Sequence, residues 1–452
     1  MKTTKIKSNS LNSNGLRLDA SLYLSEGIQL LSLLSSSLIK VKPLHEVTSN
    51  IFYGGRSRRI YVANPKNGIP FIKGADITKS SFSSLKLISR KRTKDLQSYA
   101  LKEGWTLITR SGSIGNTAFV NKDFIDKAAS DDIIRVCPKD IPDGFLYAYL
   151  SSKYGNLLLT QNKYGAVIQH IEPEHITNIP VPIFSESKQK EIHNLIVESA
   201  NLRVEANRLL EEAETILADN INYINFDNTQ YNCVSSNLIR NSFTKRFEAN
   251  YYIDEGEKIA NYIKNNMNYK LLREVTSDIF RPGIFKRVYV NKGITFLGGS
   301  DIVKRIPSGE KQLSYAKTKN IKSLMVEKGW ILVTCGGTIG NSIFVDSEIA
   351  KCAASQHILR LIPKYIPAGY LFTFINSSLG KKIIQRYTYG SVIPQIEPSH
   401  IEHIPIPLLN SDQIENINKL AMDSITKNET SKKKELEAIQ SVEKEIESWQ
   451  QS

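Results

Sequence analysis

Cysteine is scarce in this sequence of 452 residues, and its placement excludes cysteine-based metal sites. Cys137, Cys233, Cys335 and Cys352 form no C-x-x-C pair and have no metal-ligand spacing with the seven histidines. We therefore expect reduced and mostly packed thiols, as in a cytoplasmic protein.

Long hydrophobic runs are absent as well. The longest run near the N-terminus, GIQLLSLLSSSLIKV from Gly27, is too short and too rich in serine to span a bilayer. It also lacks the small-residue cleavage site of a signal peptide, so it predicts a helix. We expect no membrane partner.

The motifs of several enzyme classes are missing. The sequence contains no N/D-P-P-Y/F methyltransferase motif, Walker A lysine, H-E-x-x-H, G-x-S-x-G or convincing nuclease carboxylate cluster. RSGSIGN and CGGTIGN are glycine-rich, but they lie between strand-like runs, whereas a phosphate cradle needs a helix N-terminus. His175 and His400 occupy equivalent P-x-H-I positions, which favours a role in the fold. We predict no catalytic and no metal-binding residue.

Positive charge is abundant and unevenly distributed. The net charge is +14 and the pI is near 9.3, which suggests an anionic partner, most commonly nucleic acid. A merely basic protein is the alternative. Residues 185–220 carry −4 and residues 410–452 carry −3, so the remainder carries +21.

Most of the chain is a tandem duplication. YGAVIQHIEPEHITNIPVP from Tyr164 and YGSVIPQIEPSHIEHIPIP from Tyr389 agree at 12 of 19 positions, at an offset of 225. The same offset relates GIPFIKGADI to GITFLGGSDI, and EGWTLITRSGSIGNTAFV to KGWILVTCGGTIGNSIFV. Upstream, EVTSNIF pairs with EVTSDIF at 228, and RLDASLYL with RFEANYYI at 229. Solenoid repeats are much shorter, so the duplication predicts two similar domains.

Each copy is predicted to be mostly β-structure with one helix. RIYV, IPFIKG, WTLITR, NTAFV and IIRVCP are strand-like and bounded by turn residues. A single helix is predicted over 144–161, with its partner over 369–386.

Two long amphipathic helices are predicted after the extended segments IPVPI and IPIPL, because apolar residues recur there every three or four positions. Each helix could pack on its own domain, but their length, acidity and matching positions favour pairing with each other. The predicted organisation is a first domain with an N-terminal helical segment, a central helix, a second domain and a C-terminal helix, over 1–184, 185–221, 222–409 and 410–452.

These motifs, in this order and present twice, resemble the specificity (S) subunit of Type I restriction–modification systems. The resemblance rests on RLDASLYL, GIPFIKGADI, GWTLITRSGSIGN, YG-x-V-I-x-x-IEP and IPVP before a long helix, and it covers essentially the whole chain. It implies an α+β fold, in which two mixed α/β target recognition domains are separated by two long antiparallel coiled-coil helices with pseudo-two-fold symmetry.

The resemblance also implies a function. Each domain would read one part of a bipartite site on double-stranded DNA, and two DNA methyltransferase subunits would dock on the chain. Restriction subunits would join in the full complex, in the cytoplasm. The chain itself would be non-catalytic and hold no cofactor, because S-adenosylmethionine belongs to the methyltransferase subunit.

Positions that differ between the copies inside a preserved frame are candidates for base readout. The candidates are Arg110, Ser111, Asp131, Asp132, Gln169, His170, Gln356, His357 and Gln395. In the alignment of the two copies, Arg110 corresponds to Cys335 and Ser111 corresponds to Gly336. Arginine suits guanine and glutamine suits adenine in the major groove. Neutral drift of surface loops is the alternative explanation.

Basic residues in the least similar stretch, with two matched pairs upstream, are predicted to contact phosphates, which supply affinity but little sequence information. They are Arg58, Arg59, Lys86, Arg90, Lys91, Arg92, Lys94, Lys286, Arg287, Lys304, Arg305, Lys311, Lys317 and Lys319. A solvated charged face is the competing interpretation.

Two other functions stay open at this point. The chain could be the specificity subunit of a related two-part system whose partner fuses nuclease and methyltransferase. It could also be a stand-alone DNA-binding regulator, but the 225-residue duplication and the acidic helices would then be unexplained.

Overall fold

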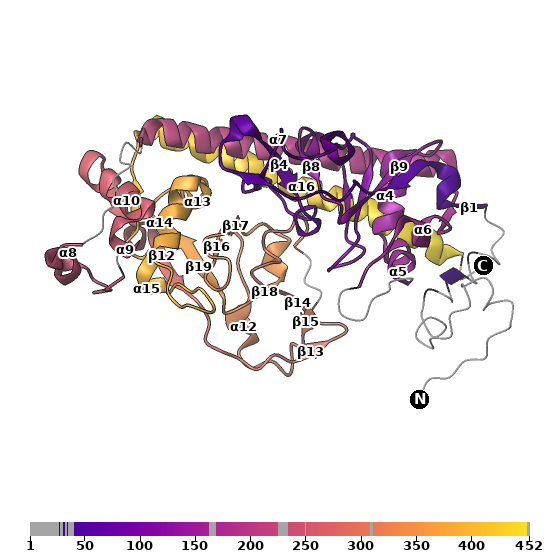
Figure 1. Ribbon diagram of the computed structural model, residues 1–452. Coiled ribbons are helices and arrows are strands. Elements are labelled where there is room, and N and C mark those ends of the chain that lie inside the picture. The colour runs from indigo at the N-terminus through magenta and orange to yellow at the C-terminus, as the bar shows by residue number, and fades with distance from the viewer. Residues whose placement is uncertain are drawn as a thin grey trace. The chain divides into compact units, whose positions relative to one another are not determined.

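The computed structural model describes residues 40–161, 169–224, 234–248, 250–307 and 311–449, together with residues 27, 30, 31 and 34. The chain divides into two compact units, Met1–Val204 with Thr430–Ser452, and Glu205–Glu429 (Figure 1). Both boundaries fall within the long helices, so each unit holds one domain and half of each helix. The RLDASLYL motif and most of the predicted N-terminal helical segment lie outside the described residues.

The first unit contains one two-stranded and two four-stranded sheets. Their strand orders are β1-β10, β2-β9-β6-β7 and β3-β5-β4-β8, and only the β4–β8 pair is parallel. The strands are β1 (Val41–Pro43), β2 (Thr48–Phe52), β3 (Tyr61–Val62), β4 (Gly68–Ile72), β5 (Leu87–Ser89), β6 (Thr106–Thr109), β7 (Thr117–Phe119), β8 (Ala128–Ala129), β9 (Ile133–Pro138) and β10 (Pro180–Pro182).

The second unit repeats these orders as β11-β20, β12-β19-β16-β17 and β13-β15-β14-β18. Its strands are β11 (Tyr269–Leu271), β12 (Thr276–Phe280), β13 (Tyr289–Val290), β14 (Ile294–Leu297), β15 (Lys311–Leu313), β16 (Ile331–Thr334), β17 (Ser342–Phe344), β18 (Ala353–Ala354), β19 (Ile358–Pro363) and β20 (Pro405–Pro407). The predicted duplication of a mixed fold is therefore confirmed at the level of strand order.

The single helix predicted over 144–161 is wrong, because two helices meet there. They are α4 (Asp143–Ser151) and α5 (Lys153–Gln161), and Ser152 between them has extended backbone. The Ser152 hydroxyl accepts a hydrogen bond from the amide of Gly155 at 3.2 Å, which caps α5. The second unit breaks in the same way at Ser377, between α13 (Ala368–Asn376) and α14 (Ser378–Arg386).

Several further α-helices belong to the described fold. They are α6 (Pro173–Ile176) in the first unit, and α8 (Ser236–Asn241), α9 (Asn250–Ile253), α10 (Glu255–Asn266), α11 (Leu272–Val275), α12 (Ile321–Leu324) and α15 (Pro398–Ile401) in the second.

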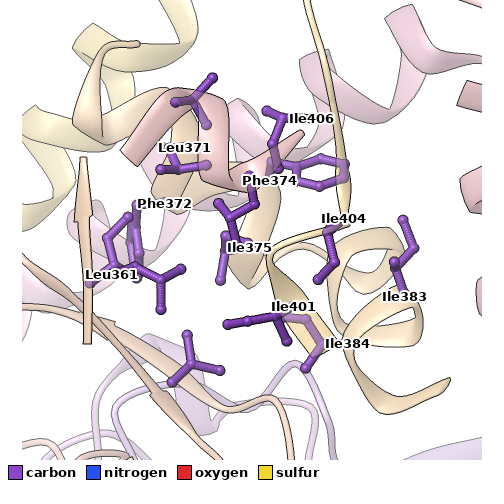
Figure 2. Packing of buried hydrophobic residues seen from close by; sticks show 14 of the residues in the cluster. Leu361, Leu371, Phe372, Phe374, Ile375, Ile383, Ile384, Ile401, Ile404 and Ile406 are labelled. Carbon is purple, nitrogen blue, oxygen red and sulfur yellow. The ribbon is translucent and has the colours of Figure 1, made fainter. Parts of the chain in front are cut away.

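The main core of the second unit lies between α13, α14 and the segment that leads into β20 (Figure 2). Phe374 and Ile375 of α13 face Ile383 and Ile384 of α14, and all four side chains are fully buried. Burial of side chains of this size stabilises a fold by roughly 1.5–3 kcal/mol each. The corresponding core of the first unit is built around α4 and α5.

The two long helices, α7 (Glu186–Ile221) and α16 (Ser411–Ser448), lie side by side within each unit (Figure 1). In the first unit the Ser199 hydroxyl donates to the Ser431 carbonyl at 2.8 Å, and in the second the Ser424 hydroxyl donates to the Ala206 carbonyl at 2.6 Å. These small residues allow close approach of the backbones. Within the second unit Ala206 contacts Ser424 and Asn220 contacts Gln413, so the antiparallel pairing is confirmed.

Each domain also packs closely on the helix that follows it. The Gly144 amide donates to His193 Nδ1 of α7 at 3.1 Å, and the Gly369 amide donates to Asn418 Oδ1 of α16 at 2.9 Å. A Cβ at either glycine would lie 2.8 Å from a backbone carbonyl oxygen, that of His193 or Asn418. Only glycine fits at these two contacts without displacing the backbone.

Gly144→Ala and Gly369→Ala should each lower the free energy of unfolding by about 1–3 kcal/mol, because the added methyl group overpacks the contact. Gly283→Ala is the matched control, since a Cβ at Gly283 meets nothing within 4 Å. Chemical denaturation of the three variants measures the effect. Equal stability of Gly369→Ala and Gly283→Ala would contradict the close-packing role.

Candidate nucleic-acid interface

Three segments that carry predicted base-reading residues converge in the first unit. The Arg110 amide donates to the Asp132 carbonyl at 3.0 Å, and the Ile171 amide donates to the Arg110 carbonyl at 3.0 Å. Ser111 and His170 form an isolated antiparallel bridge. The end of β6, the β8–β9 turn and the segment before α6 therefore form one surface, which we name the first patch. It comprises Arg59, Arg110, Ser111, Asp131, Asp132, Gln169, His170 and Glu172.

The second unit makes the same arrangement. The Cys335 amide donates to the His357 carbonyl at 2.9 Å, and the Ile396 amide donates to the Cys335 carbonyl at 3.1 Å. Gly336 and Gln395 form the matching bridge. The second patch comprises Arg281, Arg287, Cys335, Gly336, Gln356, His357, Gln395 and Glu397. All nine predicted base-reading residues thus lie in one patch or the other, although the sequence separates them by up to 60 positions within a copy.

The first patch is rich in carboxylates held by arginine. Arg59 Nη2 lies 2.8 Å from Asp131 Oδ1 and 3.1 Å from Asp132 Oδ2. The Ser111 hydroxyl donates to Asp132 Oδ1 at 3.0 Å. Burial opposes ionisation of Asp132, but the bonds from Ser111 and Arg59 outweigh it and hold the pKa of this carboxyl below its ordinary value. Asp132 is therefore an ionised acceptor at neutral pH.

The second patch has neutral groups where the first has carboxylates. Arg287, the counterpart of Arg59, donates to Gln356 Oε1 at 3.3 Å. Burial, together with Arg287 and Arg281, lowers the pKa of His357, so its imidazole is neutral at pH 7. The two patches share a backbone frame but present different hydrogen-bonding groups.

A buried arginine holds the turn beneath each patch, and motif analysis missed both. Arg135 and Arg360 are equivalent, and each is 0% exposed. Arg135 Nη1 donates to the carbonyls of Ser130 at 3.1 Å and Ile133 at 2.7 Å, and Arg360 Nη1 donates to Ser355 at 2.8 Å. Burial lowers the pKa of each guanidinium to about 10, so both stay charged at neutral pH. The matched arginine in IIR and ILR was the available signal.

A glutamate of the IEP motif pairs with an arginine in each patch, but the arginine follows a different strand in each unit. Arg110, after β6, bonds Glu172 through Nε at 3.1 Å. Its counterpart in the second unit is Cys335, and there Arg281, after β12, bonds Glu397 through Nη2 at 2.7 Å. Arg281 is the counterpart of Tyr53 at the upstream offset of 228.

The side chain of Arg110 is placed differently from what base readout requires. Arg110 is 3% exposed, and its guanidinium lies 4.4 Å from the centre of the Tyr53 ring. Its pair with Glu172 would have to open before it could reach a base. Asp131 is also largely buried, whereas Gln169 is exposed and Ser111 and Asp132 are half-buried.

Most predicted phosphate contacts lie on the surface. Arg58, Arg59, Lys86, Arg90, Lys91, Arg92, Lys94, Lys286, Arg287, Lys311, Lys317 and Lys319 are exposed. Arg305 is a correction, because at 7% exposure it is not available to a phosphate. Lys304 is half-buried and pairs with Asp301 at 2.7 Å, so its charge is partly compensated.

The glycine-rich stretches are turns between antiparallel strands, as predicted. Gly112 and Gly115 between β6 and β7 have φ of 72° and 82°, and Gly337 and Gly340 repeat this between β16 and β17. Neither turn leads into a helix, so neither supplies the helix N-terminus that a phosphate cradle needs. The predicted role of His175 in the fold is also confirmed, because its Nδ1 accepts from the Glu172 amide at 3.0 Å.

The predicted packing of the thiols is confirmed for Cys137, Cys335 and Cys352, which are buried and free. Burial raises the pKa of each to about 11. Cys233 lies outside the described residues. Within the described ranges, no group of three or more His, Cys, Asp or Glu side chains could hold a metal ion. Among the helices that the structure describes, none is long and apolar enough to cross a membrane.

Comparisons with known proteins match both copies of the repeat. A family model for the Type I restriction modification DNA specificity domain matches residues 56–214 and 277–440. The S subunit of a Type I restriction–modification system from M. genitalium is similar at 14% identity, over 91% of this chain and 95% of that chain, with a TM-score of 0.37. The HsdS subunit from Thermoanaerobacter tengcongensis is similar at 14% identity, over 90% and 95%, with a TM-score of 0.29.

Arg135→Met and Arg360→Met should each lower the free energy of unfolding by about 2–4 kcal/mol, because buried carbonyls lose their donor. Arg58→Met, at an exposed position, should change it by less than about 0.5 kcal/mol. Thermal and denaturant unfolding measure both. If Arg135→Met is as stable as Arg58→Met, the guanidinium does not hold the turn.

Proposed function

The chain belongs to the Type I restriction modification DNA specificity family, and from this membership we propose that each patch reads one part of a bipartite DNA site. The function of the family is sequence recognition, so the chain is the DNA-specificity subunit of a restriction–modification complex. The alternative functions, a subunit of a system with a fused nuclease-methyltransferase partner and a stand-alone regulator, are less well supported.

One observation carries the proposal: residues that differ between the two copies lie together in each unit, on a backbone whose hydrogen bonds are the same in both. Hydrogen bonds of the backbone at Arg110 and at Cys335 are the same in both units, while the side chains around them differ. Base identity is read through side-chain donors and acceptors at base edges. A constant frame with variable groups can therefore read two different sequences.

The chemistry of each patch indicates which bases suit it. Asp132 in the first patch is an ionised acceptor, which suits the amino group of cytosine. Gln356 and Gln395 in the second patch carry amides, which suit adenine. The exposed basic residues around the patches would bind phosphates and set the register on the duplex.

The long helices are the proposed docking surface for two methyltransferase subunits. The stretches 185–220 and 410–452 carry net charges of −4 and −3, and both units pair α7 with α16 through equivalent serine contacts. Equivalent surfaces suit two identical partners. Restriction subunits would join this assembly.

Catalysis is proposed to belong to the partner. The glycine-rich turns do not suit S-adenosylmethionine, because they join strands and not a strand to a helix. Adenine methylation would then take place on the methyltransferase subunit, which binds the cofactor. Since the target is the DNA of the cell, the complex would act in the cytoplasm.

Variants in the two patches should act on separate parts of the site. Asp132→Asn should alter the bases required in one part only, and His357→Ala should alter only the other, because each good hydrogen-bonded contact between a side chain and a base edge is worth about 1–3 kcal/mol of discrimination. Methylome sequencing of cells that express each variant with the methyltransferase subunit gives the recognised motif. Cells with the wild-type chain but no methyltransferase subunit should show no methylation.

Lys139→Ala and Lys364→Ala are matched controls, because these exposed lysines follow the far ends of β9 and β19. Both should leave the motif unchanged. A change in both parts of the motif with Asp132→Asn would contradict separate reading, and an unchanged motif would remove Asp132 from the readout.

Replacing Lys91, Arg92 and Lys94 together by glutamine should weaken binding to all DNA sequences alike. The slope of log affinity against log salt should fall by about 0.9 for each phosphate that the variant no longer neutralises. Replacing the exposed lysines Lys139, Lys270 and Lys364, which lie outside the long helices and the patches, is the control with equal charge change. Fluorescence anisotropy over a salt series with the complex measures this, and a loss confined to one sequence would rule out phosphate contacts.

A further inference from the structure

We propose that Arg281 is a base-reading residue of the second patch and that it reads a guanine. This rests on the proposed function of the patches. Arg281 was not among the residues selected by comparing the two copies, because its counterpart is Tyr53 and the upstream offset differs from that of the patch motifs.

The arginine that pairs with the preserved glutamate comes from a different position in each unit: Arg281 stands where the first unit has Tyr53, and Cys335 stands where it has Arg110. In the first unit the strand β6 supplies Arg110 to Glu172, and Tyr53 follows β2. In the second unit the strand β12 supplies Arg281 to Glu397. The ion pair is kept in both units while the strand that carries the arginine changes.

The arginine of the second unit is more exposed than that of the first. The side chain of Arg110 is 4% exposed, and the Tyr53 ring lies over its guanidinium. The side chain of Arg281 is 27% exposed, and that of Glu397 is 28% exposed. The pair of Arg110 and Glu172 therefore supports the first patch from the interior. The pair of Arg281 and Glu397 is accessible to a ligand.

Arg281 also lies among the other groups of the second patch. Its charge is close enough to His357 to help lower the pKa of that imidazole. Glu397 accepts a hydrogen bond from the Tyr389 hydroxyl at 2.5 Å, in addition to the one from Arg281. The guanidinium is thus held from one side by a carboxylate that is itself fixed in place.

A guanidinium held in this way can still bind a base. Arginine has five N–H donors, and the bond to Glu397 is made through Nη2. Guanine presents two acceptors, N7 and O6, on its major-groove edge, and an arginine pairs with both. A donor group at this position selects guanine over bases that present an amino group there.

The test measures binding of the complex, formed by the full chain and its methyltransferase subunit, to DNA that contains its site. At one guanine in one part of the site, 7-deazaguanine should weaken binding of the wild-type complex, because it lacks the N7 acceptor. With Arg281→Ala, guanine and 7-deazaguanine should bind equally at that position, and discrimination against other bases should fall by about 5- to 150-fold. The other part of the site should be read normally.

Arg281→Lys keeps the positive charge, so a complex with this variant should still fold and bind DNA. It should lose the two-point contact with guanine, which shows that the effect is on base reading and not on folding. Lys364→Ala is the control, because this exposed lysine follows the far end of β19 and its replacement should leave guanine discrimination unchanged in both parts of the site. Equal sensitivity of the wild type and Arg281→Ala to 7-deazaguanine at every guanine would overturn the role of Arg281. The effects of Asp132 and His357 variants would still test half-site reading independently.

Discussion

The turn beneath each patch depends on a buried guanidinium that binds backbone carbonyls. Arg135 and Arg360 each donate to carbonyls on both sides of the β8–β9 or β18–β19 turn, and each is fully buried. A buried charge is costly unless its donors are satisfied, so the surrounding carbonyls must point inward at fixed positions. This requirement leaves the side chains between them, Asp131 and Asp132 or Gln356 and His357, directed to the patch and free to differ.

The duplication thus separates what must be constant from what can vary. Three features recur in both units: the backbone hydrogen bonds at the ends of β6 and β16, the buried arginine that holds the turn, and the glutamate of the IEP motif. Within this frame one patch carries Asp131 and Asp132, and the other carries Gln356 and His357 at the same positions. The exchange of Arg110 and Arg281 shows that even the preserved ion pair tolerates a change of strand, provided that one guanidinium reaches the glutamate.

The same principle holds where the domains meet their helices. Gly144 and Gly369 approach the backbone of α7 and α16 so closely that a methyl group cannot be accommodated. Ser199 and Ser424 make equivalent contacts between the helices. These contacts are kept in both units although the patches have diverged.

The sequence by itself determined the duplication, the strand runs, the long helices and the family, because these follow from periodicity and from motifs repeated at a constant offset. It also identified the three segments that form each patch, since they diverge inside a preserved frame. Only the tertiary structure decided that Arg110 and Arg305 are buried, that the helix over 144–161 breaks at Ser152, and that Arg281 replaces Arg110 as the partner of the glutamate. Comparison of aligned positions cannot detect such an exchange, because side chains from different strands meet only when the sheet has formed.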